Sequence, residues 1–255
     1  MDKAAAKQND NAAALLPLNP ALDPAALAAE FAIDQRIQIR DVLEPEAASA
    51  ITKLLVEQTP WGLSWQAGND GPHRIRSEQL PALGPQDGRR MADGLTRAMQ
   101  GDDFAFVYSQ YRMSKAVIEG WSKSPAHDAL VSALNGTLFL DFIRTVTALP
   151  EIRVCDAQAS HYGPNQFLSL HQDISVEENE DRLVAYVLNL VPDRWRPDWG
   201  GYLNFFDEAG DISHGYMPRF NCLNLFRVPR HHNVSYVAPF AAGNRLAVTG
   251  WFRTR

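Results

Sequence analysis

The spacing of apolar residues divides the chain into a helix-rich first part and a strand-rich second part. Residues 22–34 follow the helical period, with Asp23 suited to the N-cap position and Pro24 to the first helical position. Residues 36–43 alternate isoleucine with polar residues, which predicts a strand. Residues 44–58 return to the helical period, so a second helix is expected there.

The pattern is weaker over the next hundred residues. Residues 59–88 are rich in glycine, proline and tryptophan, which indicates irregular structure. Residues 89–100 suit a helix and residues 104–113 a strand. Residues 124–147 form one long helical pattern, in which Ser124 is the expected cap.

After residue 150 the pattern changes to short apolar runs separated by turn-rich connectors. Six such runs occur, at residues 153–163, 182–191, 201–207, 221–228, 232–239 and 245–252. Several strands in series at short spacing are typical of a sandwich or barrel. We therefore predict a mainly β fold with flanking helices, an α+β arrangement in which helices pack outside a β core.

Length and composition favour one domain. A chain of 255 residues, of which 45% are hydrophobic, can bury one sizeable core. We expect a single domain over residues 21–255, in which residues 21–149 form a helix-rich support and residues 150–255 the β core. Residues 1–20 are rich in alanine and asparagine without a strong apolar stripe, so we predict a flexible N-terminal arm.

Charge, apolar run length and cysteine content argue against a nucleic-acid-binding, membrane or disulfide-rich protein. The net charge of −6 gives no electrostatic reason to expect a nucleic-acid partner. No apolar run approaches the roughly 20 residues that a membrane helix needs, and the N-terminal apolar piece is broken by Pro17. Cys155 and Cys222 are the two cysteines, too few for a disulfide framework. These features predict a soluble, cytoplasmic protein that binds neither nucleic acid nor membrane.

Candidate chemistry begins with the triplet His171-Gln172-Asp173. Residues two apart on an extended backbone point to the same face about 7 Å apart, so an imidazole and a carboxylate can converge on one ion. His232 follows 59 residues after Asp173, and Arg245 follows 13 residues later. Two histidines and one carboxylate form the facial triad that binds non-haem Fe(II), and an arginine offers a fixed fork for a carboxylate.

Strand phase assigns faces to these residues. In residues 245–252, side chains Arg245, Ala247, Thr249 and Trp251 share one face, whereas the opposite row is fully apolar. If the arginine points into the barrel, the apolar row packs against the helices.

The same alternation of side chains distinguishes the two adjacent histidines. His232, Val234 and Tyr236 share one face, whereas His231 follows Arg230 at a turn. His232 is the preferred ligand and His231 its neighbour, either close to the site or solvated.

With these residues in place, the chain resembles the Fe(II)/2-oxoglutarate-dependent dioxygenases, and within them the prolyl-4-hydroxylase-type branch. The segments that carry the resemblance are "YGPNQFLSLHQD", "WGGYLNFFD", "HHNVSYV" and "RLAVTGWF". It covers residues 150–255 with specific motifs and residues 22–58 more loosely. In the family a histidine followed by x-V-x-x-V occurs here, and this matches His232 and not His231.

The resemblance implies a double-stranded β-helix, a jelly-roll or cupin-like core with helices on one sheet. It implies iron at His171, Asp173 and His232, which become the catalytic residues, and 2-oxoglutarate bound by Arg245 and, as a weaker assignment, Tyr162. Fe(II), 2-oxoglutarate and O2 are the implied cofactor and cosubstrates, with ascorbate as an optional addition. The implied reaction hydroxylates a substrate C–H bond and releases succinate and CO2. Because Asp173 fills the position that a halogenase leaves vacant, a halogenase is disfavoured.

The sequence leaves the substrate open. A prolyl residue in a protein or peptide is the first reading, and another amino acid or small metabolite is the second. A non-catalytic jelly-roll binding module is a third, although such a module has no need of all four residues at the site. A homodimer is the default expectation, because two-fold dimers are the commonest oligomers.

Two loop segments are candidates for a role at the substrate cleft. Trp195 and Trp199 either close the cleft or cover the barrel edge, beside the pair Gly200-Gly201 that suits close backbone passage. The acidic run at 174–182 suits a solvated loop or a lid over substrate.

Overall fold

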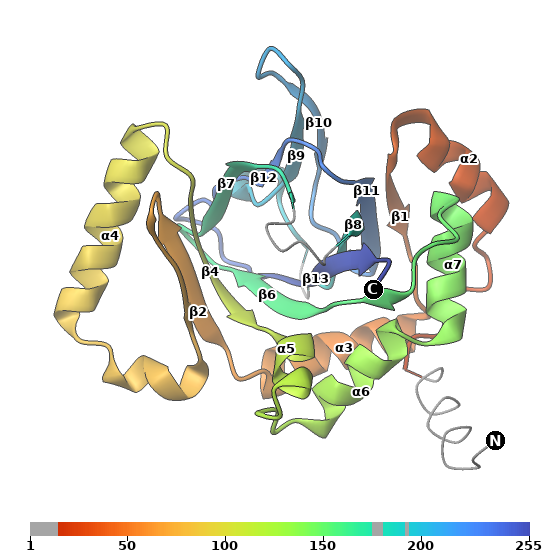
Figure 1. Cartoon of the computed structure of the whole chain (residues 1–255), viewed down its shortest axis with the longest axis horizontal. Helices are drawn as coiled ribbons and strands as arrows, with labels where there is room; N and C mark the ends of the chain where they lie inside the picture. The colour runs from red at the N-terminus through yellow and green to blue at the C-terminus, as the bar shows by residue number, and fades with distance from the viewer. Residues whose placement is uncertain (1–14, 175–180, 192–193) are drawn as a thin grey trace.

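A computed structural model describes residues 15–174, 181–191 and 194–255 of the chain. Its centre is one antiparallel sheet that curves into a trough, with α3, α5 and α6 beneath it, α4 outside one end and α2 and α7 at the other (Figure 1). The predicted mainly β fold with flanking helices is confirmed.

The elements have the following bounds. The helices are α2 (Pro24–Asp34), α3 (Pro45–Gln58), η1 (Ser77–Ala82), α4 (Pro85–Gln100), α5 (Met113–Ile118), α6 (Pro125–Leu134), α7 (Thr137–Thr147) and η2 (Pro197–Trp199). The strands are β1 (Arg36–Arg40), β2 (Gly62–Ala67), β3 (Asp70–Ile75), β4 (Ala105–Tyr111), β5 (Val154–Cys155), β6 (Gln158–Tyr162), β7 (Phe167–His171), β8 (Arg182–Asn189), β9 (Leu203–Phe206), β10 (Ile212–Tyr216), β11 (Cys222–Arg227), β12 (His232–Val234) and β13 (Arg245–Arg253).

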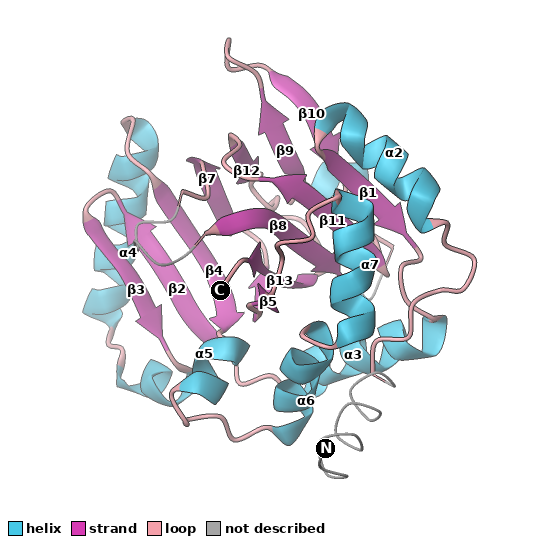
Figure 2. Ribbon diagram, turned by 45° about the vertical axis from the view of Figure 1, so that its right-hand side comes forward, coloured by secondary structure: helices cyan, strands magenta, loops and turns pink. Residues whose placement is uncertain are grey.

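Strand order shows how the sheet becomes a jelly roll. The larger part runs β1-β11-β8-β13-β6-β4, and β4 also pairs with β7, which begins the smaller part β7-β12-β9-β10. The junction is narrow, since Phe106 and Val107 of β4 pair with Leu168 and Phe167 of β7. The two parts therefore face each other across the trough, and Figure 2 shows the same sheet after a turn of 45° about the vertical axis.

Two apolar layers hold this arrangement together. The larger core lies between the sheet and the helices, and it includes the row Leu246, Val248 and Phe252 of β13. The prediction that this row packs against the helices is confirmed. Its neighbours on β13 alternate to the other side, where Ala247 contributes to a smaller cluster with Phe205 and Phe226. Strand β13 thus separates the helix-facing core from the interior of the trough.

The first helix forms where the sequence predicts it. The Asp23 side chain accepts hydrogen bonds from the backbone N–H groups of Ala25 and Ala26, at 3.0 and 3.2 Å. These bonds satisfy donors that the first turn of a helix leaves unpaired.

Residues 59–88 are not irregular as predicted. They contain the hairpin β2–β3 followed by η1 and the start of α4. β2 pairs along its length with β4, so partners distant in sequence supply the hydrogen bonds that order it. Its glycine and proline residues hid the strand signal, because these residues usually weaken strands. Strands β5, β7 and β10 were also not predicted as separate elements.

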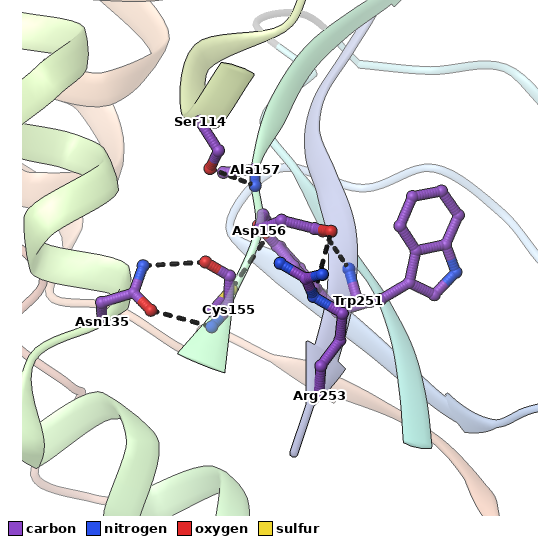
Figure 3. Close-up of polar contacts among 8 residues, drawn as sticks. Ser114, Asn135, Cys155, Asp156, Ala157, Trp251 and Arg253 are labelled. Carbon is purple, nitrogen blue, oxygen red and sulfur yellow. Dashed lines mark hydrogen bonds and ion pairs between the residues drawn. The ribbon is translucent and has the colours of Figure 1, made fainter. Parts of the chain in front are cut away.

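The long helix predicted over residues 124–147 is two helices. The helix α6 ends at Leu134 and α7 begins at Thr137, with a bend of 42° between them. Asn135 lies in the break, and its side chain bonds both backbone groups of Cys155 at 2.8 Å (Figure 3). Ser124 precedes α6 but makes no capping bond; its hydroxyl contacts His127 Nδ1 at 2.5 Å.

The N-terminal arm was predicted over residues 1–20, of which the structure describes only residues 15–20. Residues 1–14 lie outside the described part of the chain, but Leu16 is buried in the main core and Leu18 bridges Leu43. The helix-rich support also contributes strands β1 to β4 to the common sheet, so it does not form a separate layer of helices.

The described residues contain no single helix long and apolar enough to cross a membrane, and the bent pair α6 and α7 meets the criterion only by joint length and composition. Cys155 and Cys222 are buried free thiols.

Replacing Asn135 with alanine should destabilise the fold by about 1–3 kcal/mol, because the N–H of Cys155 then loses its partner inside the protein. Urea unfolding monitored by circular dichroism measures the change. Ser132→Ala is the control, since this exposed hydroxyl bonds only the Asp128 carbonyl of its own helix and should change stability by less than about 0.5 kcal/mol. Equal effects of the two variants would contradict the role given to Asn135.

Candidate metal centre

Two paired strands bring the three candidate ligands together. His171 is the last residue of β7 and His232 the first of β12, and the antiparallel register places them opposite each other. Asp173 follows β7 by two residues, and its carboxylate oxygens lie 3.6 Å from His171 Nε2 and 3.5 Å from His232 Nε2. One donor atom from each residue lies within 4.8 Å of the others. This spacing allows all three to hold one metal ion.

Backbone contacts set the orientation of both imidazoles. His171 Nδ1 lies 2.8 Å from the carbonyl oxygen of Ser169, and His232 Nδ1 lies 2.8 Å from that of Arg230. A carbonyl only accepts, so Nδ1 carries the hydrogen in each ring. In the neutral form, each Nε2 then directs its lone pair toward the space beside Asp173, as a metal ligand requires.

The protonation states also suit a cation. Burial raises the pKa of Asp173, but the neighbouring His171 and His232 more than offset this effect, and the pKa falls to about 2. Burial and the neighbouring His171 lower the pKa of His232 to about 4. At neutral pH the group is therefore an ionised carboxylate beside a neutral His232, a donor set that fits a divalent transition metal.

Arg245 begins β13 and is only 1% exposed. Among the described residues, its Nε and Nη1 atoms have no hydrogen-bond partner. Its guanidinium lies 5.0 Å from the ring centre of Tyr162, which is opposite it in the β13–β6 register. Burial lowers the pKa of Arg245. A buried guanidinium with free donors is costly, and a bound carboxylate is the ligand chemistry that would satisfy it.

The pair Gly200-Gly201 gives Arg245 its space, as the sequence predicted for a close backbone approach. Both glycines have φ of +68°. A side-chain Cβ on Gly200 would lie 2.0 Å from the carbonyl oxygen of Tyr236, and one on Gly201 would lie 3.2 Å from Arg245 Cδ. Trp195 closes the same corner, and a Cβ on Gly201 would lie 3.3 Å from its ring.

The triad and the arginine open into one cavity of about 350 Å³. Arg245, Thr249 and Trp251 line it from β13, which confirms the predicted inward row. Trp195 and Trp199 are not among its lining residues; they pack edge to face with ring centres 5.3 Å apart in a neighbouring cluster. Residues 175–180, most of the acidic run considered as a lid, lie outside the described residues.

The end of β13 is fixed beside this cavity by Asp156 (Figure 3). The Trp251 backbone N–H donates to Asp156 Oδ1 at 2.8 Å, and Arg253 Nε lies 3.5 Å from Asp156 Oδ2. The guanidinium of Arg182 lies 3.9 Å from the centre of the Trp251 ring. These contacts hold the indole as a fixed wall of the cavity.

Several cavity residues had no signal in the sequence analysis. Tyr108 of β4 stacks on Tyr162 with ring centres 4.9 Å apart. Arg74, Arg112 and Gln158 also line the cavity. The alternation in residues 104–113 could have indicated Tyr108, but the direction in which it points depends on the pairing of β4 with distant strands.

The residues near His232 in the sequence differ in whether they are buried or exposed. His231 is exposed and lies outside the triad, where the Gln172 side-chain amide contacts its Nε2 at 2.8 Å. Val234 is buried beside His232, but Tyr236 is 49% exposed. The prediction that Tyr236 shares the inward face is wrong, because β12 ends at Val234.

Gly201→Ala should destabilise the protein by about 1 kcal/mol more than Gly210→Ala, because a new methyl group overpacks against Arg245 and Trp195. Both glycines have positive φ, of +68° and +89°, so the backbone strain is common to both, but a Cβ on Gly210 would meet nothing within 4 Å. Chemical denaturation of the two variants measures the difference. Equal losses would show that Gly201 is needed only for its backbone conformation.

Comparisons with known proteins give one family match. The family described as the 2OG-Fe(II) oxygenase superfamily matches residues 157–253, which contain the triad and Arg245. Curated protein sequences give no match.

Solved structures of similar fold include a prolyl-4-hydroxylase from Pseudomonas putida, at 20% identity and a TM-score of 0.55, covering 94% of this chain and 99% of that one. An oxidoreductase of the 2OG-Fe(II) oxygenase family from Burkholderia pseudomallei has 12% identity and a TM-score of 0.61, with 94% of each chain covered. The non-haem alpha-ketoglutarate-dependent epimerase SnoN from nogalamycin biosynthesis has 12% identity and a TM-score of 0.54, covering 90% of this chain and 83% of that one. Residues 157–253 therefore match the 2OG-Fe(II) oxygenase superfamily, a family that implies Fe(II), 2-oxoglutarate and dioxygen, and the chain as a whole has the fold of solved oxygenase structures, among them a prolyl-4-hydroxylase.

Proposed function

We propose that this enzyme hydroxylates a C–H bond of a prolyl substrate, with iron held by His171, Asp173 and His232 and with 2-oxoglutarate bound by Arg245 beside Tyr162. One observation carries the proposal. A donor set suited to a divalent metal lines the same cavity as Arg245, a buried arginine whose Nε and Nη1 have no hydrogen-bond partner within the described part of the chain.

Bound Fe(II), with 2-oxoglutarate and dioxygen, supplies oxidative decarboxylation coupled to hydroxylation, and releases succinate and CO2. The residues of the chain prepare the site for this chemistry. The carbonyl groups of Ser169 and Arg230 keep both imidazoles in the orientation that binds metal. The pKa of Asp173 is about 2, so its carboxylate is ionised at neutral pH and can bind a cation.

Arg245 acts on the cosubstrate through its buried position. A charge-assisted bond is stronger in a site with little water than at a surface. The ring of Tyr162 covers one side of the guanidinium, and Gly201 leaves room for its side chain. The arginine is thereby held in place before 2-oxoglutarate arrives, which lowers the entropy cost of binding.

Two considerations support a prolyl substrate. The fold is that of the Pseudomonas putida prolyl-4-hydroxylase, and the sequence motifs around the site resemble the same branch. The similar fold of the SnoN epimerase favours keeping a second candidate, an oxygenase that acts on a small metabolite.

Measuring succinate release separates the candidates. The enzyme is given proline, proline-containing peptides or cell extract, and the products are examined by mass spectrometry for a gain of one oxygen. If no succinate forms with Fe(II), 2-oxoglutarate and air, the enzyme reading fails and a binding module remains.

His232→Ala should abolish stoichiometric Fe(II) binding, whereas His231→Ala should retain it. The two residues are adjacent, but only His232 directs a nitrogen toward Asp173. Anaerobic equilibrium dialysis followed by iron analysis measures both variants. Loss of iron from the His231 variant, or its retention in the His232 variant, would reverse the assignment.

Arg245→Ala should weaken 2-oxoglutarate binding by about 100-fold, because a paired carboxylate–guanidinium contact is worth about 3 kcal/mol. Calorimetric titration of 2-oxoglutarate into the anaerobic Fe(II) protein measures the change. Arg245→Met preserves more of the side-chain volume and should show the same loss, so a packing defect in the alanine variant can be recognised. Retained affinity in both variants would exclude this role for Arg245.

A further inference from the structure

The cavity that holds the candidate metal centre adjoins a second one. This neighbouring cavity has a volume of about 500 Å³, and Arg74 and Arg112 line both. The two guanidinium groups therefore lie where the cavities meet. Their position is away from the triad residues and Arg245, and the proposed reaction assigns them no role.

Strand register explains why both arginines face the cavities. Ser64 of β2 pairs with Arg74 of β3 on one side and with Tyr108 of β4 on the other. Residues paired in this way direct their side chains to the same face, and Tyr108 stacks on Tyr162 inside the cavity. Arg112 follows Tyr108 by four residues and lines the same space.

Neither arginine has a close ionic partner. Among the residues that the structure describes, no ion pair within 4.0 Å involves Arg74 or Arg112, and the charges that favour ionisation of Arg112, on Glu119 and Asp156, act from a greater distance. Burial lowers the pKa of Arg112, and the nearby charge of Arg74 lowers it further. Two like charges are thus kept near each other in a cavity wall, an arrangement that an anion would stabilise.

The two acidic residues that line the second cavity already form ion pairs with other basic residues. Glu78 pairs with Arg76 at 3.0 Å, and Glu119 pairs with Lys115 at 2.9 Å. Its lining contains five basic and two acidic side chains, although the whole chain has a net charge of −6. This excess of positive charge is therefore local to the cavity and does not reflect the general composition.

A third residue, Gln110, favours a peptide as the bound ligand. Gln110 lines the second cavity between Tyr108 and Arg112 in sequence, is 5% exposed, and its Oε1 has no hydrogen-bond partner among the described residues. A buried amide oxygen needs a donor, and a backbone N–H of a bound chain is one. The two cavities lie on either side of the residues that they share, Arg74 and Arg112, so a bound chain could occupy both.

We infer that the substrate is a peptide segment with an acidic side chain close to the reacting residue, and that Arg74 and Arg112 bind this carboxylate. The inference rests on the proposed function for the reaction itself. It adds the specificity-determining pair and the charge of the substrate. Arg74 is exposed and Arg112 half-buried, so a ligand can reach both.

A binding selection tests the inference without turnover. Metal-free protein is immobilised and offered a pool of short peptides that contain one central proline, with flanking positions drawn equally from Asp, Glu, Asn, Gln and Ala. Mass spectrometry of the retained peptides should show acidic residues enriched about tenfold or more over their amides at one or two flanking positions. Retention without this preference would overturn the inference, as would no retention of any peptide.

A charge-matched pair of variants shows where the preference arises. Arg74→Gln/Arg112→Gln should lose the enrichment. Arg89→Gln/Arg97→Gln removes the same charge from the exposed side of α4, where neither residue lines a cavity, and should keep it. Equal loss in both double variants would show a general effect of charge and would overturn the assignment to Arg74 and Arg112.

The same pool, incubated with the Fe(II) enzyme, 2-oxoglutarate and air, tests the proposed function separately. Succinate release without acidic selection would leave the proposed function intact and remove the inference. If acidic peptides are selected through Arg74 and Arg112 but no peptide gives succinate, the binding inference stands and the proposed function is contradicted.

Discussion

The pairing of β12 with β7 is the contact on which the site depends. It places His232 opposite His171 on neighbouring antiparallel strands, at the end of β7 from which Asp173 follows. A shift of one residue would turn His232 away and present His231 instead, since successive side chains of a strand alternate between faces. Each histidine ring is further held by the backbone carbonyl group two residues before it in the chain, so the site is organised before any metal binds.

Burial of Arg245 is the second constraint, and it connects the fold to the cosubstrate. Arg245 is 1% exposed, and its Nε and Nη1 have no hydrogen-bond partner among the described residues. Such a buried charge is unfavourable unless a ligand accepts these hydrogen bonds. The fold tolerates this cost because Tyr162 covers the guanidinium and Gly201 leaves space beside it. Strand β13 then has two roles: its apolar row joins the core under the helices, while its polar row lines the cavity.

Much of this architecture could be predicted because its signals are local. Alternation along residues 245–252 is enough to assign the inward row, and the spacing of His171 and Asp173 is enough to place them on one face. The hairpin β2–β3 and the position of Arg74 could not be predicted, because they depend on pairing with β4, about forty residues away in the chain. Likewise, the break at Asn135 depends on a contact with Cys155, and the packing of Leu16 depends on a core assembled from distant segments.

The central claim is that the three-residue cluster and Arg245 together form one site for iron and 2-oxoglutarate. Anaerobic addition of Fe(II) and then 2-oxoglutarate, followed by visible absorption, tests it most directly. The account predicts a weak charge-transfer band that appears only when both are present, saturates at one equivalent of each, and disappears in Asp173→Ala. Absence of the band in the folded wild-type protein, or its persistence in Asp173→Ala, would contradict the account.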